Sequence, residues 1–599
     1  MPGCDVCCPG EPRRRIWSAA TTSLYRNWPA PAREYPLGCD TSLSAHIVLA
    51  KMGQSIVQRV MAASSLFRPD VSWWVAATFA GLLAIVPLFL VDVPPLEDYP
   101  NHLARAYVLL FGAQDPFLSR MYEPSWHVVP NLGMDLIVPP FLRVLPLHVV
   151  GRGFLGLVLL LQFVATLALH RAIHRRRSWW PLASCLILYN GLFLRGYLNF
   201  LLGTGAALLV AAWWTQLWQR RPGYATAILT LGAMATFFAH LLSFAFLELF
   251  VSCTVAEDFI RLRQQNKPRG LQVARGAAMV AASSAIPSLL YFMSRLADAT
   301  GEVSYASLAG KLLRLNVAVL NYHRPLDVAT SGVILSMTGL CLLYGLHRRT
   351  AEARPRTQVL PARILLAISI LLLLWSVLPS HMKNLAWVDT RFPFLATILL
   401  FAGLNPPELP RRLTLVATAL VAGLFLVRTG VLAKIWFEHR QLLVELRQTI
   451  APVIPGSRVL VARVDPQSDP DWWHSLPANH RTEGMGSADD YISALLIPER
   501  SAFWPLLFTD PAQQPLRVLP EYGSLSASLR DPADYRLLLQ PNKELDGEFA
   551  YLKDWQRHFD YVLMINPSGA PDLATLLPIL DEVARSPVAV LYRNLQRAG

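Results

Sequence analysis

Long apolar stretches separated by short polar segments recur along the chain from residue 70 to residue 435. The first stretch, Trp73 to Val91, is almost uninterrupted. At about 1.5 Å per residue it is long enough to cross a bilayer core of roughly 30 Å. The pattern predicts a polytopic α-helical membrane protein with about eleven transmembrane helices. We place these spans at residues 73–91, 150–169, 179–194, 198–218, 224–240, 241–257, 273–293, 328–346, 362–379, 392–405 and 412–434.

Basic residues are concentrated in the short segments between alternate spans. Cytoplasmic loops of membrane proteins are enriched in Lys and Arg, so these clusters indicate which loops face the cytoplasm. We expect an integral protein of the bacterial inner membrane, with its N-terminus in the cytoplasm and its C-terminal domain periplasmic or extracellular. The clusters are Arg171, Arg175, Arg176 and Arg177; Arg220 and Arg221; Arg261, Arg263, Lys267 and Arg269; Arg348 and Arg349; and Arg411 and Arg412.

Composition agrees with this class of protein. The 599 residues are 53% hydrophobic and their mean hydropathy is +0.35, which argues against one soluble core. A formal net charge of +13 is typical of proteins that bind nucleic acid. Here the basic residues are concentrated in the loops between spans, so we interpret the net charge as a sign of membrane topology. We therefore predict the lipid bilayer, not nucleic acid, as a partner.

Three regions follow from these patterns. Residues 1–70 are predicted to be a poorly structured cytoplasmic extension, in which Cys4, Cys7, Cys8 and Cys39 have no second ligand pair nearby that would favour a zinc site. Residues 71–435 form the transmembrane domain, whose outer loop spans 92–149. The apolar segment from Leu132 to Pro146 is too short to cross and is predicted to be a helix that lies on, or dips into, the outer surface.

Residues 436–599 are less hydrophobic and are predicted to form a small extracytoplasmic α/β domain. Short β-rich runs appear at Arg458–Val464, Tyr561–Ile565 and Val588–Tyr592, with helical patterns between them. About 160 residues are enough for an independent core.

The most informative segment follows the first span directly. Glu97 and Asp98 are adjacent carboxylates at the start of a predicted helix, in which Asp98 can cap the first turn. His102 and Arg105 fall on the same helical face as Asp98. A carboxylate, an imidazole and a guanidinium at the membrane surface are suited to removing a proton beside an anionic group. The alternative is a helix cap with ordinary solvated charges.

Further polar residues lie in or just outside the spans and are expected on the same side of the membrane. Ionisable groups at membrane depth are costly and usually serve a site or an interhelical pair. The alternatives are packing for a histidine, an interhelical hydrogen bond for the asparagine, and snorkelling or pairing with Asp389 for Arg391. These residues are Arg195, Asn199, His240, His323, Lys383, Asp389 and Arg391.

The layout resembles the GT-C glycosyltransferase superfamily, whose members include protein O-mannosyltransferases and the aminoarabinose transferases of lipid A. The sequence Glu97-Asp98-Tyr99, followed by Ala104-Arg105, is similar to that family's acidic pair and the Arg-Tyr that follows it. The segment Asp389 to Pro393 is similar to the start of a late span in several members. The order Glu-Asp, where Asp-Glu is commoner, and His102 depart from the family pattern.

The resemblance implies transfer of a sugar from a polyprenyl-phosphate donor to an extracytoplasmic lipid, glycan or protein acceptor, with inversion. Asp98 or Glu97 would deprotonate the acceptor. The donor phosphate would be bound by Arg391, Lys383 or Arg195. The residues in supporting positions would be His102, Arg105, Asn199, His240, His323 and Asp389.

The residue types near the first span also raise the question of a metal. Carboxylate oxygens and imidazole suit Mg²⁺ or Mn²⁺, so Glu97, Asp98 and His102 are candidate ligands for a divalent cation, although nothing in their spacing demands one.

Two other classes of protein have many spans and buried charges. A flippase or transporter of lipid-linked glycans would be expected to show broken helices near the midplane and internal repeats. A noncatalytic protein of envelope assembly would account for the outer domain but not for charges clustered beside spans.

Overall fold

The computed structural model describes residues 69–597 except 266–269, 300, 302, 352–357, 383–384, 408, 467 and 483–485. Ser72–Gly599 form one compact unit, distinct from Met1–Val71. The predicted cytoplasmic extension, with its four cysteines, therefore lies outside the described residues except for its last two positions.

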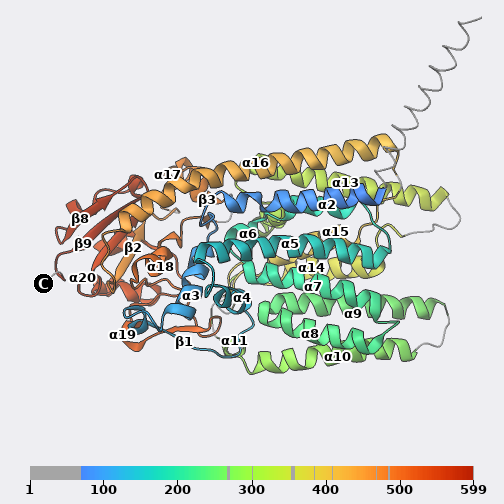
Figure 1. Ribbon diagram of the computed structural model, residues 1–599, viewed down its shortest axis with the longest axis horizontal. Coiled ribbons are helices and arrows are strands. Elements are labelled where there is room, and N and C mark those ends of the chain that lie inside the picture. Colours follow the sequence, from blue (N-terminus) through green and yellow to red (C-terminus); the bar gives the residue numbers. More distant parts are fainter. Residues whose placement is uncertain are drawn as a thin grey trace, which may run out of the picture. The chain divides into compact units, whose positions relative to one another are not determined.

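Helices dominate the first part of the compact unit (Figure 1). Seven helical segments among the described residues are long and apolar enough to cross a membrane, which agrees with a polytopic helical protein; the number eleven stays a prediction. The long helices are α2 (Pro69–Ile85), α5 (Leu147–His174), α7 (Leu198–Leu217), α8 (Pro222–Ala239), α9 (Leu241–Gln264), α10 (Gly270–Phe292), α13 (Arg324–Ala351), α14 (Ala362–Val377), α15 (Arg391–Gly403) and α16 (Arg411–Ile450).

The segment predicted as a span at 179–194 is not a continuous α-helix, and that prediction is wrong in form. It consists of a 3₁₀ stretch, η3 (Trp180–Ile187), and one short turn, α6 (Gly191–Arg195). Asn190 starts the second piece because its side chain accepts the backbone N–H groups of Leu192 and Phe193. All residues of η3 are buried. Irregular backbone at membrane depth is tolerated where protein surrounds it.

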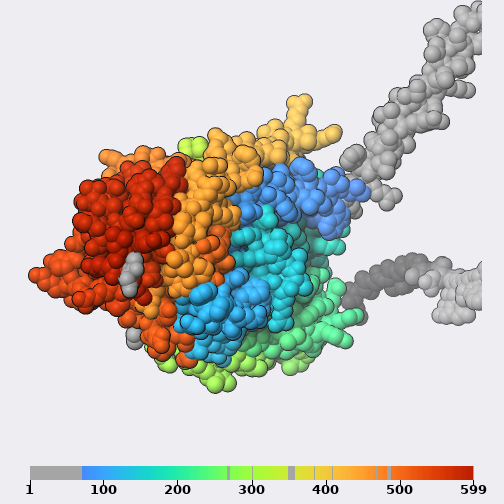
Figure 2. All heavy atoms as spheres, turned by 60° about the vertical axis from the view of Figure 1, so that its left-hand side comes forward, coloured from blue at the N-terminus to red at the C-terminus, as the bar shows by residue number. Residues whose placement is uncertain are grey.

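The outer loop 92–149 contains α3 (Tyr99–Phe111), β1 (Tyr122–Pro124) and α4 (Gly133–Phe141). At nine residues, α4 is about 14 Å long, too short to cross, as predicted. The strand β1 pairs antiparallel with β5 (Leu516–Val518), so the outer loop shares a sheet with the C-terminal domain. In Figure 2 the blue surface of the early chain lies beside the orange and red surface of that domain.

The C-terminal part of the chain contains a five-stranded sheet with short helices, and the domain boundary at residue 436 stays a prediction. Helix α16 continues without a break across that residue to Ile450. The sheet has the order β6-β2-β7-β9-β8, with β6, β2 and β7 parallel and β9 and β8 antiparallel. All five residues of β7 are buried, which explains its continuous apolar sequence. These strands are β2 (Val459–Arg463), β6 (Ala533–Asp534), β7 (Tyr561–Ile565), β8 (Leu580–Arg585) and β9 (Ala589–Asn594).

Short elements complete the described chain. They are η1 (Val86–Phe89), η2 (Leu118–Arg120), α11 (Arg295–Asp298), α12 (Leu308–Leu313), η4 (Leu315–Ala318), α17 (Pro470–Ser475), η5 (Ala478–His480), β3 (Arg481–Thr482), β4 (Gly486–Ser487), η6 (Ile492–Leu495), α18 (Leu496–Arg500), α19 (Pro520–Gly523), η7 (Tyr535–Leu539), η8 (Asn542–Glu544), η9 (Gly547–Leu552), α20 (Trp555–His558), η10 (Pro567–Gly569) and α21 (Leu573–Leu576).

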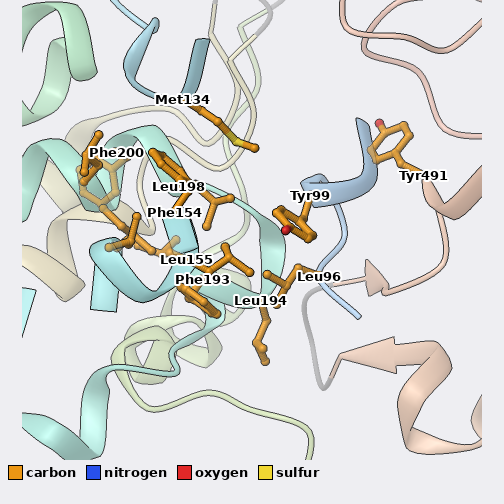
Figure 3. Close-up of a cluster of buried hydrophobic side chains, with 14 of the residues drawn as sticks. Leu96, Tyr99, Met134, Phe154, Leu155, Phe193, Leu194, Leu198, Phe200 and Tyr491 are labelled. Carbon is orange, nitrogen blue, oxygen red and sulfur yellow. The ribbon is translucent and has the colours of Figure 1, made fainter. Parts of the chain in front are cut away.

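The residues that flank the Glu97–Asp98 pair belong to the hydrophobic core. Leu96 and Tyr99 are fully buried, and Figure 3 shows them beside Leu194 in a cluster of apolar side chains. Burial of both neighbours fixes the backbone on each side of the two carboxylates.

Candidate active site

A cavity of about 530 Å³ lies between the helical part and the C-terminal domain. Residues from the outer loop, from the α6–α7 turn, from the start of α15 and from the C-terminal domain line it. The structure therefore brings together side chains separated by hundreds of positions in sequence. Of the predicted site residues, the following lie on its wall: Glu97, Asp98, His102, Arg195, Asn199, His240 and Arg391.

Backbone hydrogen bonds attach the Glu97–Asp98 loop to the α6–α7 turn. Glu97 N donates to the Leu194 carbonyl at 2.9 Å, and Asp98 N donates to the Arg195 carbonyl at 3.2 Å. Gly196 follows, with a φ of +89°, and a Cβ there would lie 2.6 Å from the Asp98 Cβ. Only glycine combines this backbone conformation with so close an approach.

The Asp98 side chain is directed to the cavity, not to the helix. Asp98 occupies the N-cap position of α3, but its carboxylate makes no capping hydrogen bond, so the predicted capping role is wrong. No described residue forms a hydrogen bond or ion pair with this carboxylate. Burial raises the pKa of Asp98 to about 7, although Arg195 opposes the shift. An unpaired carboxylate with this pKa is suited to accept a proton near neutral pH.

Unlike Asp98, Glu97 forms an ion pair with another described residue. Arg195 Nη2 donates to Glu97 Oε1 at 2.9 Å, and both side chains are buried. Burial raises the pKa of Glu97 well above its usual range, with Arg195 acting in the opposite direction. The guanidinium of Arg195 also stacks on Trp387, with its Cζ 4.5 Å from the ring centre. This pair is therefore better suited to shape the cavity wall than to exchange protons.

His102 is held in one protonation state by its neighbours. Arg105 Nη2 lies 3.1 Å from His102 Nδ1. Because a guanidinium can only donate, Nδ1 must accept, and the ring proton is on Nε2. The ring also hydrogen-bonds the Gly196 backbone. Burial, together with Arg105, lowers the pKa of His102 well below its usual value. His102 is a neutral side chain beside Asp98.

The predicted divalent-cation site at Glu97, Asp98 and His102 does not fit this geometry. Within the described part of the chain, no group of three or more His, Cys, Asp or Glu side chains is arranged to hold a metal ion. The Nδ1 lone pair of His102 is directed to Arg105, and Glu97 is directed to Arg195. We therefore derive no step through a metal.

Arg391 is a buried cation of the cavity with open bonding capacity, as is Arg195, whose Nε and Nη1 also have no hydrogen-bond partner among the described residues. Arg391 is 4% exposed, and its Nε and Nη1 have no hydrogen-bond partner among the described residues. Its Cζ lies 4.5 Å from the centre of the Tyr197 ring and 5.9 Å from that of Phe200. Stacking fixes the plane of the guanidinium and leaves its N–H edge available for a planar or tetrahedral anion.

Asn199 and His240 lie on the wall but also have local bonds. Asn199 Oδ1 accepts Met134 N at 2.7 Å, and its Nδ2 donates to the Asn131 carbonyl at 2.9 Å. His240 Nδ1 accepts Leu242 N at 3.1 Å at the start of α9. Asn199 thus joins α7 to α4, which agrees with the interhelical hydrogen bond that the sequence left open as the alternative for this residue.

Three predicted residues that the structure describes do not line the cavity. Arg105 is fully buried in a two-point ion pair with Asp135, at 2.7 and 2.9 Å, and so supports His102 from behind. His323 is exposed, and its Nδ1 accepts Leu326 N at the start of α13. Asp389 accepts Ser380 Oγ at 2.8 Å, so it does not pair with Arg391 as considered. Lys383 lies outside the described residues.

The sequence did not predict the wall that the C-terminal domain contributes. No local spacing relates this wall to Asp98, so only the fold could reveal it. Tyr197 and Trp387 were also missed, although both are aromatic residues within two positions of a predicted charge, and that proximity was a usable signal. The missed residues of the domain include Arg463, Tyr491, Phe508, Gln514, Asp531, Glu548 and Tyr551.

Comparison with known proteins gives distant structural neighbours. No family model matches the chain, and no curated protein matches it significantly. The chain is similar to ArnT from Cupriavidus metallidurans bound to undecaprenyl phosphate, at 12% identity and a TM-score of 0.46, over 88% of this chain and 99% of that one. ArnT in the apo state gives the same values.

A second neighbour is the arabinofuranosyltransferase AftD from Mycobacteria, at 14% identity and a TM-score of 0.40, over 86% of this chain and 40% of that one. Both neighbours belong to the superfamily that the sequence resembles. Similarity at this level carries no argument about function, which has to be derived from the site.

Proposed function

We propose that this chain is an inverting glycosyltransferase that moves a sugar from a polyprenyl-phosphate donor to an extracytoplasmic acceptor. One observation carries the proposal: the unpaired carboxylate of Asp98 and the buried, partly unpaired guanidinium of Arg391 line the same cavity. A base and an anion-binding group on one cavity are what transfer from a phosphate-linked donor requires.

The reaction follows from these two groups. Asp98 accepts the proton of an acceptor hydroxyl or amine, whose oxygen or nitrogen attacks the anomeric carbon of the donor sugar. The bond from that carbon to the phosphate oxygen breaks, and its electron pair leaves with the polyprenyl phosphate. Arg391 binds the phosphate and stabilises the charge that develops on it, so its contribution is larger in the transition state than in the ground state.

The proposal places the cavity on the extracytoplasmic side. Arg176 at the end of α5 donates to Asn405 Oδ1, which follows α15, whereas Arg391 at the start of α15 lies on the cavity. The basic residues after α5 and the cavity are thus at opposite ends of the helices. With basic loops in the cytoplasm, the cavity faces outwards.

A flippase and a noncatalytic assembly protein would not need the charged groups that line this cavity. A flippase has to bind and release a charged head group, and an assembly protein has to present a surface. Neither function needs a carboxylate whose pKa is raised by burial to near neutral pH, on the same cavity as an arginine with unpaired N–H groups.

The pH dependence of transfer tests the role of Asp98. Because its pKa is about 7, the base is protonated and inactive on the acid side. We expect kcat/KM to fall by about tenfold per pH unit below that value and to level off above it. The measurement is a pH–rate profile of the purified protein with a polyprenyl-phosphate sugar. A flat profile through neutral pH would contradict the role of Asp98 as the base. As a control, Asp581 is an exposed carboxylate outside the cavity, and the Asp581→Asn variant should keep the wild-type profile.

A further inference from the structure

The cavity has a second wall, made by the C-terminal domain, with a carboxylate opposite Glu97 and Asp98. Asp531 follows α19 in the chain, and its side chain is 58% exposed. Tyr491 Oη donates to Asp531 Oδ1 at 3.4 Å, and Arg463 Nη2 lies 3.5 Å from Oδ2. Asp531 lines the same cavity as Glu97 and Asp98, and its charge contributes to raising the pKa of both.

The groups around Asp531 are held in place before any ligand arrives. Arg463, at the end of β2, forms an ion pair with Asp490 as well as with Asp531. Gln514 is 2% exposed, lines the cavity and has an Oε1 atom without a hydrogen-bond partner among the described residues. A buried acceptor without a partner is costly, which favours a hydrogen-bond donor beside it. Gln514 therefore points to a ligand that donates hydrogen bonds.

Aromatic rings alternate with these polar groups. Phe508 lies between His102 and Tyr491, with ring centres 5.5 and 5.1 Å away and both contacts edge-on. Phe549 and Tyr551 line the same wall. A sugar ring has apolar C–H faces and a rim of hydroxyl donors and acceptors. A wall that combines aromatic faces with carboxylate, amide and guanidinium groups matches both properties.

One side chain of α3 joins the two walls directly, in addition to the pairing of β1 with β5. Asn101 Nδ2 donates to the Leu506 carbonyl, and its Oδ1 accepts Phe508 N, both at 2.9 Å. Asn101 is adjacent to His102, so the aromatic wall is tied to the helix that begins at Asp98. The cavity is incomplete without the C-terminal domain.

The position of Arg391 divides the cavity between two substrates. Arg391 begins α15, an apolar helix whose residues are mostly buried among the other helices, so a phosphate at Arg391 would lie on the helical side of the cavity. Asp98 lines the same cavity as Arg391 and the wall of the C-terminal domain. With the phosphate on the helical side, the group that loses its proton to Asp98 would lie against that wall.

We propose that the C-terminal domain binds the acceptor, that the acceptor is a carbohydrate, and that Asp531 and Gln514 accept hydrogen bonds from its hydroxyl groups. This proposal rests on the proposed function, because it assigns the second substrate of the same cavity. Asp531 is a positioning residue: it orients the sugar, and the transferred proton goes to Asp98.

The test measures binding of two kinds of probe to the full chain in lipid nanodiscs. The first is a panel of labelled oligosaccharides of hexose, pentose and amino-sugar units, with Ser/Thr-containing peptides as non-carbohydrate acceptors. The second is undecaprenyl phosphate. We expect at least one class of oligosaccharide to bind and the peptides not to bind. Asp531→Asn and, separately, Gln514→Leu should each weaken oligosaccharide binding by about tenfold.

The same two variants should leave the affinity for undecaprenyl phosphate unchanged, which also shows that they are folded. Asp581→Asn, the same substitution at an exposed site outside the cavity, should alter neither affinity. The proposal is overturned if no oligosaccharide binds, if binding does not depend on Asp531, or if a peptide binds in an Asp531-dependent way. Loss of phosphate binding in Arg391→Met tests the proposed function instead, so the two failures are distinguishable.

Discussion

Replacement of Asp98 by Asn is expected to lower the rate of sugar transfer by about 10²–10⁴-fold, the usual cost of losing a general base. The amide has nearly the shape of the carboxylate, and no described residue depends on the carboxylate for a hydrogen bond or ion pair. The variant should therefore fold and should bind undecaprenyl phosphate as the wild type does. Single-turnover transfer and lipid binding by the same preparation provide the measurement.

Glu97→Gln is the informative comparison. The amide oxygen can still accept the Arg195 hydrogen bond, but the charge partner of Arg195 is lost. We expect a smaller loss of rate than in Asp98→Asn, because Glu97 is engaged with Arg195. If Asp98→Asn keeps near-normal turnover and Glu97→Gln is inactive, then Glu97 and not Asp98 is the general base.

Replacement of Arg391 by Lys is expected to weaken donor binding by about tenfold and to lower kcat/KM further. Lysine keeps the charge but cannot present two N–H groups to one phosphate, and it loses the planar stacking on Tyr197 and Phe200. The additional loss of rate arises because the phosphate gains charge as the sugar departs. Donor titrations at saturating acceptor separate the two effects.

Arg440→Lys is a matched control for this substitution. Arg440 also stacks on an aromatic ring, with its Cζ 5.4 Å from the centre of Phe437, but it is exposed on α16 and does not line the cavity. Normal donor binding is expected there. If Arg391→Lys behaves like Arg440→Lys, the phosphate is bound elsewhere.

Features that depend on local pattern could be predicted from the sequence. Apolar length predicted most of the long helices, and an apolar run predicted β7 at its observed bounds, Tyr561–Ile565. The segment 179–194 differs because Asn190 caps a separate short helix, whereas hydropathy alone indicates only that the segment is buried. Helix α16 continues past its apolar part to Ile450, beyond residue 436, and hydropathy did not predict this extension.

The candidate site was predictable only in part. Proximity to a span identified Glu97, Asp98, Arg195 and Arg391. It did not distinguish a residue that faces the cavity from Arg105, whose partner Asp135 comes from another helix. The second wall could not be predicted at all, because Asp531 reaches Asp98 only through the docking of the C-terminal domain on α3.

A cryo-EM structure of the full chain in nanodiscs with undecaprenyl phosphate would show directly where the donor phosphate binds. We expect the phosphate on the N–H edge of Arg391, inside the cavity that Asp98 lines, with the polyprenyl chain leaving towards the lipid. A phosphate bound at the opposite end of the helices, beside Arg176, would contradict this expectation.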